Sequence, residues 1–264
     1  MYAFEYHRPN SVAAAVADLG KEDAKALAGG MTLLPTMKQR LAAPSSIVEL
    51  RGIPDLVGVS RDGDAIVIKA MTRHADVAQN ATVKSAIPAL AKLAGGIGDP
   101  HVRNRGTIGG SLANNDPAAD YPAAALALGA TIVTDKRQIA ADDYFKGLFE
   151  TALGPSELIT GVRFPIPQKA GYMKFVNPAS RYALVGVFVA KTAGGVRVAV
   201  TGAGESGVFR LPEFEQALGA NFSVSALEGK SVSADGINSD IHADSDYRAH
   251  LIGVMARRAV AAAG

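Results

Sequence analysis

The chain has 264 residues, of which 48% are hydrophobic and 20% charged, and this composition is typical of a globular protein rather than a disordered one. Its 27 basic and 25 acidic side chains leave a formal net charge of +2, so charge gives no reason to expect binding to nucleic acid or to an acidic membrane surface. Cysteine is absent, which excludes disulfides, thiolate catalysis and cysteine-held zinc or iron–sulfur clusters within these residues.

The length suits one large domain or two smaller ones. The segment Met1–His7 has neither a basic nor an apolar leader region, and no apolar run is long enough to cross a bilayer. We therefore expect no secretory signal, no membrane span and a cytoplasmic location.

Hydrophobic periodicity, capping residues and glycines predict the elements of the first part of the chain. Helices are expected over Ser11–Leu19, Leu33–Leu41, Thr72–Asn80, Ala86–Ala94 and Pro122–Leu128. Strands are expected over Lys25–Ala28, Ile47–Leu50, Val57–Ser60, Ala65–Lys69, Ala130–Thr134 and Glu157–Phe164. The pair of strands around Asp62 and Gly63 is the clearest hairpin, and a subdomain boundary is expected just before it.

The first of two glycine-rich segments follows the strand that ends at Ala28. Gly29 and Gly30 come next, and Thr32 is expected to cap the helix that begins at Leu33. A strand, a glycine turn and a helix in this order aim free backbone amides at one place, where a pyrophosphate would be stabilised. An ordinary tight turn between a strand and a helix gives the same pattern, and it remains open at this point.

The second glycine-rich segment, His101–Pro122, combines glycines, hydroxyls, amides, carboxylates and two arginines. Gly109 and Gly110 lack Cβ atoms, so the backbone there can lie directly against a ligand. Thr107 and Ser111 add hydroxyls, and successive exposed amides can form an anion-binding concavity. The two segments together predict one cofactor held between two glycine-rich loops.

The last part of the chain changes character after the linker expected around Pro165 and Pro167. Three strands, over Tyr172–Val176, Leu184–Ala190 and Val196–Thr201, and an amphipathic helix over Asp246–Ala263 predict a small sheet backed by helices. Residues 202–207 match the dinucleotide pattern G-x-G-x-x-G, but a helix must follow that pattern directly and here Pro212 marks a later helix start. We interpret this match as a glycine turn.

Residues equipped for catalysis are scarce. The five histidines show no metal-binding spacing, and neither a nucleophile elbow nor a phosphate-binding lysine loop is present. The pair Asp142 and Asp143 could serve acid–base chemistry, but a solvated pair is the simpler interpretation. A cofactor binder without such groups is consistent with a redox cofactor that supplies the chemistry itself.

The two glycine-rich segments, with Asp116–Asp120, resemble the FAD-binding medium subunit of the molybdenum hydroxylases, the family of carbon monoxide dehydrogenase and xanthine dehydrogenase. Segments 181–187 and 198–204 are similar to the C-terminal domain of that family, so the resemblance covers nearly the whole chain. It implies an α+β fold, with an FAD-binding domain over 1–167 and a small C-terminal α+β domain over 168–264. The first domain would have two subdomains, about 1–54 and 55–167, of the vanillyl-alcohol-oxidase or PCMH-like type, and the second a three-stranded antiparallel sheet with helices.

The resemblance also implies which residues bind non-covalent FAD. The first loop would be formed by Leu27, Ala28, Gly29, Gly30, Met31, Thr32 and Leu33, and the second by Thr107, Ile108, Gly109, Gly110 and Ser111. Hydrogen bonds to the nucleotide would come from Asn114 and Asp120. Further contacts would come from Ile97, Ile159, Lys174 and Tyr182, of which the last three could equally be a core aliphatic residue, a surface lysine and a core tyrosine. No catalytic residue and no metal ligand is expected in this chain.

In this family, electrons pass from a molybdopterin centre through two [2Fe–2S] clusters to the FAD and then to an external acceptor. The resemblance thus implies a large molybdopterin-binding subunit and a small iron–sulfur subunit as partners, assembled as one or two heterotrimers. Two alternatives stay open: a free-standing FAD oxidase or dehydrogenase, and a non-catalytic assembly protein. The small C-terminal part without a titratable cluster argues against the first, and the intact glycines of both loops argue against the second.

Overall fold

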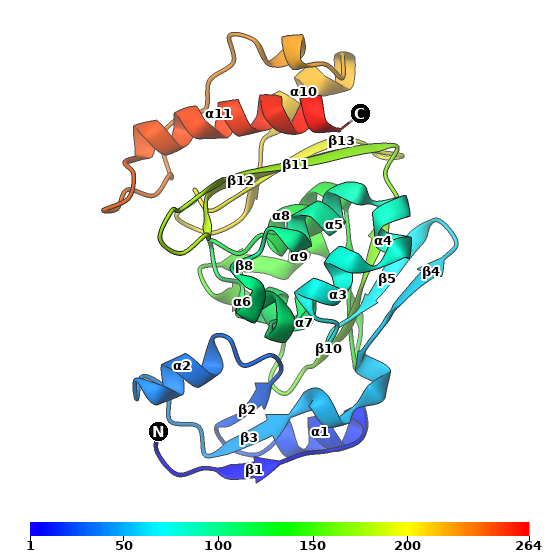
Figure 1. Ribbon diagram of the computed structural model, residues 1–264, viewed down its shortest axis with the longest axis vertical. Coiled ribbons are helices and arrows are strands. Elements are labelled where there is room, and N and C mark those ends of the chain that lie inside the picture. Colours follow the sequence, from blue (N-terminus) through cyan, green and yellow to red (C-terminus); the bar gives the residue numbers. More distant parts are fainter. Residues whose placement is uncertain (264) are drawn as a thin grey trace.

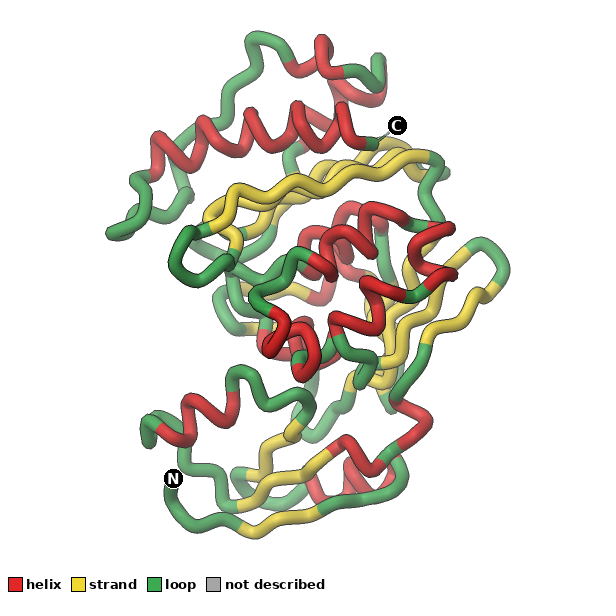
Figure 2. The backbone as a smooth tube through the Cα atoms, viewed as in Figure 1, coloured by secondary structure: helices red, strands yellow, loops and turns green. Residues whose placement is uncertain are grey.

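The structure of the chain is a computed structural model that describes residues 1–263, so Gly264, the last residue of the expected C-terminal domain, lies outside the described residues. Helices and strands are mixed in an α+β arrangement. Figure 1 shows a small N-terminal unit at one end, a helix-rich unit in the middle, and a sheet covered by a long helix at the other end. The tube in Figure 2 shows the strands of these three units as separate sheets.

The N-terminal unit is a parallel sheet with the strand order β1-β3-β2. Its elements are β1 (Glu5–His7), α1 (Val12–Leu19), β2 (Ala24–Leu27), α2 (Leu33–Lys38), β3 (Ser46–Glu49) and two short 3-10 helices, Leu50–Gly52 and Pro54–Leu56. Ser11 caps α1 as expected, because its hydroxyl accepts a hydrogen bond from the Ala14 amide at 3.3 Å. Helix α2 ends at Lys38, earlier than expected, and Arg40 just beyond it adopts φ of +61°. The Thr32 side chain makes no capping hydrogen bond, so that expectation was wrong.

The middle unit contains an antiparallel sheet with the order β4-β5-β10-β6-β7. Its strands are β4 (Val59–Asp62), β5 (Ala65–Lys69), β6 (Thr131–Thr134), β7 (Gln138–Ala140) and β10 (Ile159–Pro165), with a separate hairpin of β8 (Phe145–Gly147) and β9 (Glu150–Thr151). Its helices are α3 (His74–Gln79), α4 (Ala81–Ala86), α5 (Pro88–Gly95), α6 (Pro100–Arg105), α7 (Ile108–Asn114), α8 (Tyr121–Leu128) and α9 (Ala141–Tyr144). Asn80 caps the unexpected helix α4 by accepting hydrogen bonds from the Thr82 and Val83 amides.

The C-terminal sheet has four strands in the order β11-β12-β13-β14, not the expected three. They are β11 (Lys169–Val176), β12 (Ala183–Thr192), β13 (Gly195–Thr201) and β14 (Phe209–Arg210), followed by α10 (Pro212–Ala220), a 3-10 helix (Val224–Leu227) and α11 (Ser245–Ala262). The fourth strand arises because the chain after the glycine turn folds back onto β13, where Phe209 pairs with Val200. Helix α11 packs on β11 and β12, and α8 of the middle unit packs on β12 and β13, so helices cover both faces of this sheet (Figure 1).

The G-x-G-x-x-G segment, residues 202–207, is a turn that leads into β14 rather than into a helix, in agreement with its interpretation as a glycine turn. Gly202 has φ of +84°, and a Cβ there would lie 2.4 Å from the Ala183 carbonyl oxygen. Asp142 also has a structural partner. Its carboxylate receives Arg197 of β13 at 2.5 Å and thereby ties the middle unit to the C-terminal sheet.

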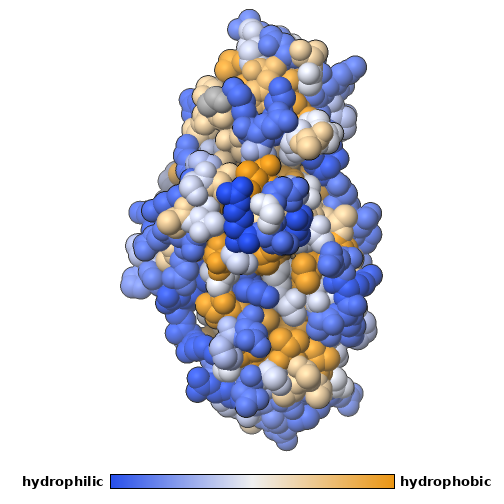
Figure 3. All heavy atoms as spheres, turned by 90° about the vertical axis from the view of Figure 1, so that its right-hand side faces the viewer, coloured by the Kyte–Doolittle hydropathy of each residue, from blue (hydrophilic) through white to orange (hydrophobic). Residues whose placement is uncertain are grey.

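No helix among residues 1–263 is long and apolar enough to span a membrane. Figure 3 shows one face of the molecule on which hydrophilic residues predominate and hydrophobic residues gather in separate patches.

Candidate functional site

A cleft with a volume of about 650 Å³ lies where the N-terminal unit, the middle unit and the turn after β11 come together. Both glycine-rich segments line it, although they are far apart in the sequence. The remaining wall is formed by α3, the chain between α5 and α6, and residues 153–159 before β10.

The two glycine-rich loops touch each other at the bottom of this cleft. A Cβ on Gly29 would lie 2.2 Å from the Arg105 carbonyl oxygen and 2.8 Å from the Gly106 Cα, so only glycine fits there. A Cβ on Gly110 would lie 3.5 Å from that of Ala28 and 3.0 Å from the Thr107 hydroxyl. The first loop can therefore approach the second to backbone contact because side chains are missing at the meeting point.

The second loop is fixed from below by the segment that follows β5. The amides of Ile108 and Gly109 donate hydrogen bonds to the carbonyls of Thr72 and Ala70, at 3.1 and 2.8 Å. The Thr107 hydroxyl accepts a hydrogen bond from the Gly110 amide at 3.2 Å and so caps α7. These contacts hold one side of the loop against the segment after β5, and the other side of the loop lines the cleft.

Backbone donors are available on the first loop. Within residues 1–263, no hydrogen-bond acceptor is found for the amides of Met31 and Thr32, and both residues line the cleft. Such donors, together with the hydroxyl of Ser111 in the same lining, are suited to phosphate oxygens.

His74 is a buried member of the cleft lining that the sequence did not single out. Its side chain packs against the tilted ring of Tyr121, and Nδ1 has no hydrogen-bond partner. Burial, reinforced by the nearby Arg103 charge, lowers the pKa of His74 to about 4, so the imidazole is neutral near pH 7. A Cβ on Gly106 would lie 2.5 Å from the His74 Nε2, which shows how closely the second loop approaches this ring.

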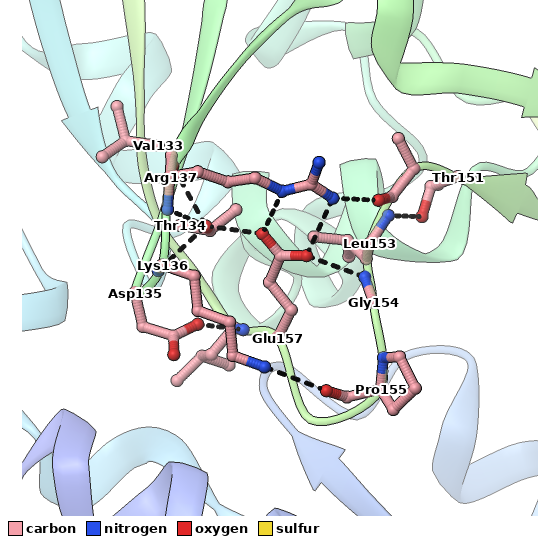
Figure 4. Close-up of polar contacts among 12 residues, drawn as sticks. Val133, Thr134, Asp135, Lys136, Arg137, Thr151, Leu153, Gly154, Pro155 and Glu157 are labelled. Atoms are coloured by element: carbon pink, nitrogen blue, oxygen red, sulfur yellow. Dashed lines mark hydrogen bonds and ion pairs between the residues drawn. The ribbon is translucent and has the colours of Figure 1, made fainter.

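Another part of the cleft wall, the turn from Leu153 to Leu158, is held by a network around Glu157 (Figure 4). Arg137 donates to both carboxylate oxygens of Glu157, at 3.0 and 3.1 Å. The Thr134 hydroxyl and the Gly154 amide donate to the same carboxylate, at 2.8 and 2.7 Å. These hydrogen bonds, led by that from Arg137, lower the pKa of Glu157 to about 2. The charged carboxylate thus fixes the turn from Leu153 to Leu158 in place.

The same turn also contacts the N-terminal unit. Ser156, which adopts φ of +56°, donates a hydrogen bond from its hydroxyl to the Leu19 carbonyl at 2.9 Å. Leu158 packs in the core of the N-terminal unit beside Leu50 and Ile53. Glu157 therefore helps to set how the N-terminal unit sits against the middle one.

At the C-terminal side of the cleft, Asp120 forms a buried ion pair with Lys174 at 2.9 Å. Burial raises the pKa of Asp120, and the Lys174 charge and the hydrogen bond from Tyr172 oppose that rise. Lys174 also donates to the Gly96 carbonyl at 2.8 Å, next to the segment that includes Ile97. The pair joins the C-terminal sheet to the middle unit.

Most of the residues expected from the sequence come together at the cleft. Its lining includes Ala28, Gly29, Gly30, Met31, Thr32, Leu33, Ile97, Thr107, Gly109, Gly110, Ser111, Asn114, Asp120, Ile159 and Tyr182. Leu27, Ile108 and Lys174 lie outside the lining. Ile108, the first residue of α7, is fully buried in the core of the middle unit. Lys174 pairs with Asp120 without itself lining the cleft. Tyr182 is 48% exposed, so the core-tyrosine interpretation was wrong.

Other lining residues were missed. Ala70, Met71 and His74 after β5, and Leu153, Ser156, Glu157 and Leu158 before β10, belong to the cleft. Two of them carry a weak signal in the sequence: His74 is one of only five histidines, and Glu157 is the first residue of a predicted strand. Neither signal names a partner, because the partners are distant in sequence.

The cleft fits a flavin dinucleotide by three observations. The glycines form a cradle that a Cβ would fill, the free amides of Met31 and Thr32 and the Ser111 hydroxyl suit a pyrophosphate, and the unpartnered Nδ1 of His74 lies within a lining whose surface is largely apolar. Within the described residues, no group of three or more histidine, aspartate or glutamate side chains is placed to hold a metal ion.

Comparison with known proteins shows the family of the chain. Residues 2–167 match the family described as the FAD binding domain in molybdopterin dehydrogenase. The chain is 38% identical to the carbon monoxide dehydrogenase medium chain of Afipia carboxidovorans, covering 98% of this chain and 96% of that one. It is 36% identical to the nicotine 6-hydroxylase medium subunit of Paenarthrobacter nicotinovorans, covering 99% and 98%.

A solved carbon monoxide dehydrogenase from Hydrogenophaga pseudoflava, which lacks the Mo-pyranopterin moiety of its molybdenum cofactor, superposes with a TM-score of 0.89. Its sequence is 36% identical, and the match covers 99% of this chain and 97% of that chain. By the match of residues 2–167 and its identity to these relatives over almost its whole length, the chain belongs to the FAD-binding medium subunits of the molybdenum hydroxylase family.

Proposed function

We propose that this chain binds one FAD non-covalently in the cleft and serves as the electron-transfer subunit of an oxidoreductase complex. When bound, the flavin supplies the redox chemistry, accepting electrons from the complex and passing them to an external acceptor. The observation that carries the proposal is the meeting of the two loops, where Gly29 lies against the Arg105 carbonyl at the base of a cleft lined by free amides.

The residues of the chain would divide the work of binding. The loop at 27–33 would hold the pyrophosphate by its free amides, and the glycines of the loop at 107–111 would let the cofactor approach the backbone, with the Ser111 hydroxyl as a donor. The Asn114 amide would donate hydrogen bonds to the nucleotide, and the Asp120 carboxylate would accept them. Ile97 and Ile159 would line the apolar part of the site and exclude water. Lys174 would act on the cofactor through Asp120, and Tyr182 would cover the flavin from the turn after β11.

We propose the same division of the chain as its sequence predicted. Residues 1–54 and 55–167 would form the two subdomains of an FAD-binding domain of the vanillyl-alcohol-oxidase or PCMH-like type, and residues 168–264 the C-terminal domain. Support comes from the sheets, because β1–β3 fall within the first range, β4–β10 within the second and β11–β14 within the third.

We propose that the chain works with two other subunits, a large one that holds molybdopterin and a small one that holds [2Fe–2S] clusters. The chain has no cysteine of its own, and thiolates are the usual ligands of such clusters. Relatives named as medium chains support a multi-subunit assembly. A dimer of heterotrimers in the cytoplasm, without nucleic acid as a partner, completes the proposal.

A titration of the purified full chain with FAD tests binding, followed by quenching of flavin fluorescence. We expect saturation at one FAD per chain and much weaker binding of riboflavin, because riboflavin has no phosphate for the loop amides. Equal affinity for riboflavin and FAD would contradict the role of the two loops, and no binding of either would contradict the proposed function.

A further inference from the structure

A buried polar cluster closes one end of the cleft, and one of its members has no assigned role. Tyr172 and Lys174, both on β11, direct their side chains at Asp120 just before α8. The Tyr172 hydroxyl donates to Asp120 Oδ1 at 2.5 Å, and the Lys174 ammonium donates to the same oxygen at 2.9 Å. Asp120 is 3% exposed and Tyr172 is 2% exposed, so bulk water does not compete for these bonds.

The two oxygens of Asp120 therefore have different surroundings. Oδ1 holds two donors from the C-terminal sheet, whereas no hydrogen bond from another residue of the described chain reaches Oδ2. Asp120 belongs to the cleft lining and Tyr172 does not. The two donors thus hold the carboxylate through Oδ1 and leave Oδ2 free to bind a ligand in the cleft.

A glycine on the neighbouring strand makes this arrangement possible. A Cβ on Gly186 of β12 would lie 2.6 Å from the Tyr172 hydroxyl oxygen and 2.9 Å from Thr201 Cγ2. The Tyr172 ring packs against Phe188 on the same strand, with 5.9 Å between ring centroids. The missing side chain at Gly186 therefore leaves the space in which the hydroxyl reaches Asp120.

We propose that Tyr172 is a positioning residue of the flavin site, which holds the Asp120 carboxylate so that Oδ2 faces the cofactor. The inference rests on the proposed function, because it requires FAD in the cleft. Tyr172 itself acts through Asp120 and does not touch the cofactor. It thereby makes the C-terminal sheet part of the flavin site without lining the cleft.

The charge state of Asp120 is the quantity that Tyr172 controls. Lys174 and Tyr172 face the carboxylate from β11, Tyr121 follows it on α8, and Tyr182, itself near Asp116, approaches from the turn after β11. Burial already raises the pKa of Asp120, and loss of the Tyr172 hydrogen bond raises it further. A neutral Asp120 would no longer repel the negative charge that the flavin gains on reduction, so the reduction potential of bound FAD would become more positive.

The test compares Tyr172→Phe with Tyr121→Phe in the full chain, with FAD as the probe. Tyr121 is a matched control, because it is also a fully buried tyrosine next to Asp120 but its hydroxyl has no partner within the described residues. We expect Tyr172→Phe to weaken FAD affinity by about tenfold or more, the cost of losing a hydrogen bond to a charged group. We also expect a positive shift of the potential that grows as the pH falls, and neither effect in Tyr121→Phe.

A second variant reaches the same bond from another strand. Gly186→Ala changes no residue of the cleft lining but crowds the Tyr172 hydroxyl, so it should shift the potential in the same direction. If Tyr172→Phe does not fold, the potential of Gly186→Ala decides: a positive shift supports the inference and an unchanged potential overturns it. An unchanged affinity and potential in folded Tyr172→Phe would overturn this inference but not the proposed function. A wild-type chain that does not bind FAD would overturn the proposed function as well.

Discussion

Gly29 lies against the backbone of Arg105 so closely that a Cβ on the glycine would be 2.2 Å from the arginine carbonyl oxygen. This contact joins two segments that the sequence separates by several helices and strands. The first loop, on the N-terminal unit, meets the second loop, on the middle unit, at this point, and the cleft opens above them. The lack of a Cβ at Gly29 is therefore required both for the packing of the two units and for the shape of the cleft.

Replacing Gly29 with alanine should separate the two loops. The new Cβ would collide with backbone rather than with a flexible side chain, so we expect FAD affinity to fall by more than about tenfold and stability to fall by about 1–3 kcal/mol. Gly219→Ala in α10 is the matched control, because nothing lies within 4 Å of its Cβ position. Fluorescence titration and urea unfolding of both variants check this, and an unchanged affinity in Gly29→Ala would contradict the contact.

Gly110→Val should separate binding from folding. Its Cβ would lie 3.0 Å from the Thr107 hydroxyl and 3.5 Å from the Ala28 Cβ, so the added methyl groups would occupy the space between the loops. We expect loss of FAD with the fold of the flavin-free protein largely kept, which circular dichroism and thermal unfolding check. Full retention of FAD by this variant would refute a site between the two loops.

Glu157→Gln should weaken the wall of the cleft in a pH-dependent way. The folded-state pKa of Glu157 is lowered to about 2, below the ordinary value of 4.5, so its stabilising effect is complete above pH 4.5 and disappears as the pH falls toward 2. We expect the variant to lose about 2 kcal/mol of unfolding free energy near neutral pH, and the difference from wild type to shrink between about pH 5 and pH 2. Denaturant unfolding across this range measures it, and a difference independent of pH would contradict the ion pair with Arg137.

His74→Phe should make the protein more resistant to acid. The folded-state pKa of His74 is lowered to about 4 from the ordinary 6.5, so the unfolded chain binds a proton that the folded one excludes when the pH falls below 6.5. The wild type therefore loses stability between pH 6.5 and pH 4 through this group, and the variant should not. Urea unfolding of both proteins at pH 7 and pH 5 provides the comparison, in which parallel losses of stability would show that His74 is not held neutral by burial.

The sequence predicted the parts of the site whose chemistry is local. Gly29 and Gly110 stand out because a close backbone approach needs glycine, and a glycine pair after a strand is visible in the sequence. The helix over 122–128 was predicted for a similar reason, because Gly129 ends it in a left-handed conformation with φ of +62°. Local rules of this kind do not depend on the rest of the chain.

The parts that depend on distant partners were not predictable in this way. Strand β14 has two residues, and it exists because Phe209 and Arg210 pair with β13. In the sequence Tyr172 is an ordinary strand aromatic, since its partner Asp120 lies 52 residues earlier, in the middle unit. The network of Glu157 likewise needs Arg137 and Thr134 from the end of β6 and the turn after it. No spacing within one segment indicates such pairs.

The most direct measurement is purification of the native protein from its own host, followed by an absorbance spectrum and by flavin and metal analysis of each subunit. The account predicts FAD on this chain, with iron and molybdenum on two co-purifying subunits. A chain that purifies alone with FAD and turns over a substrate would contradict the electron-transfer assignment and favour a free-standing oxidase or dehydrogenase. A native complex without flavin would contradict the central claim, and it would leave a non-catalytic assembly role.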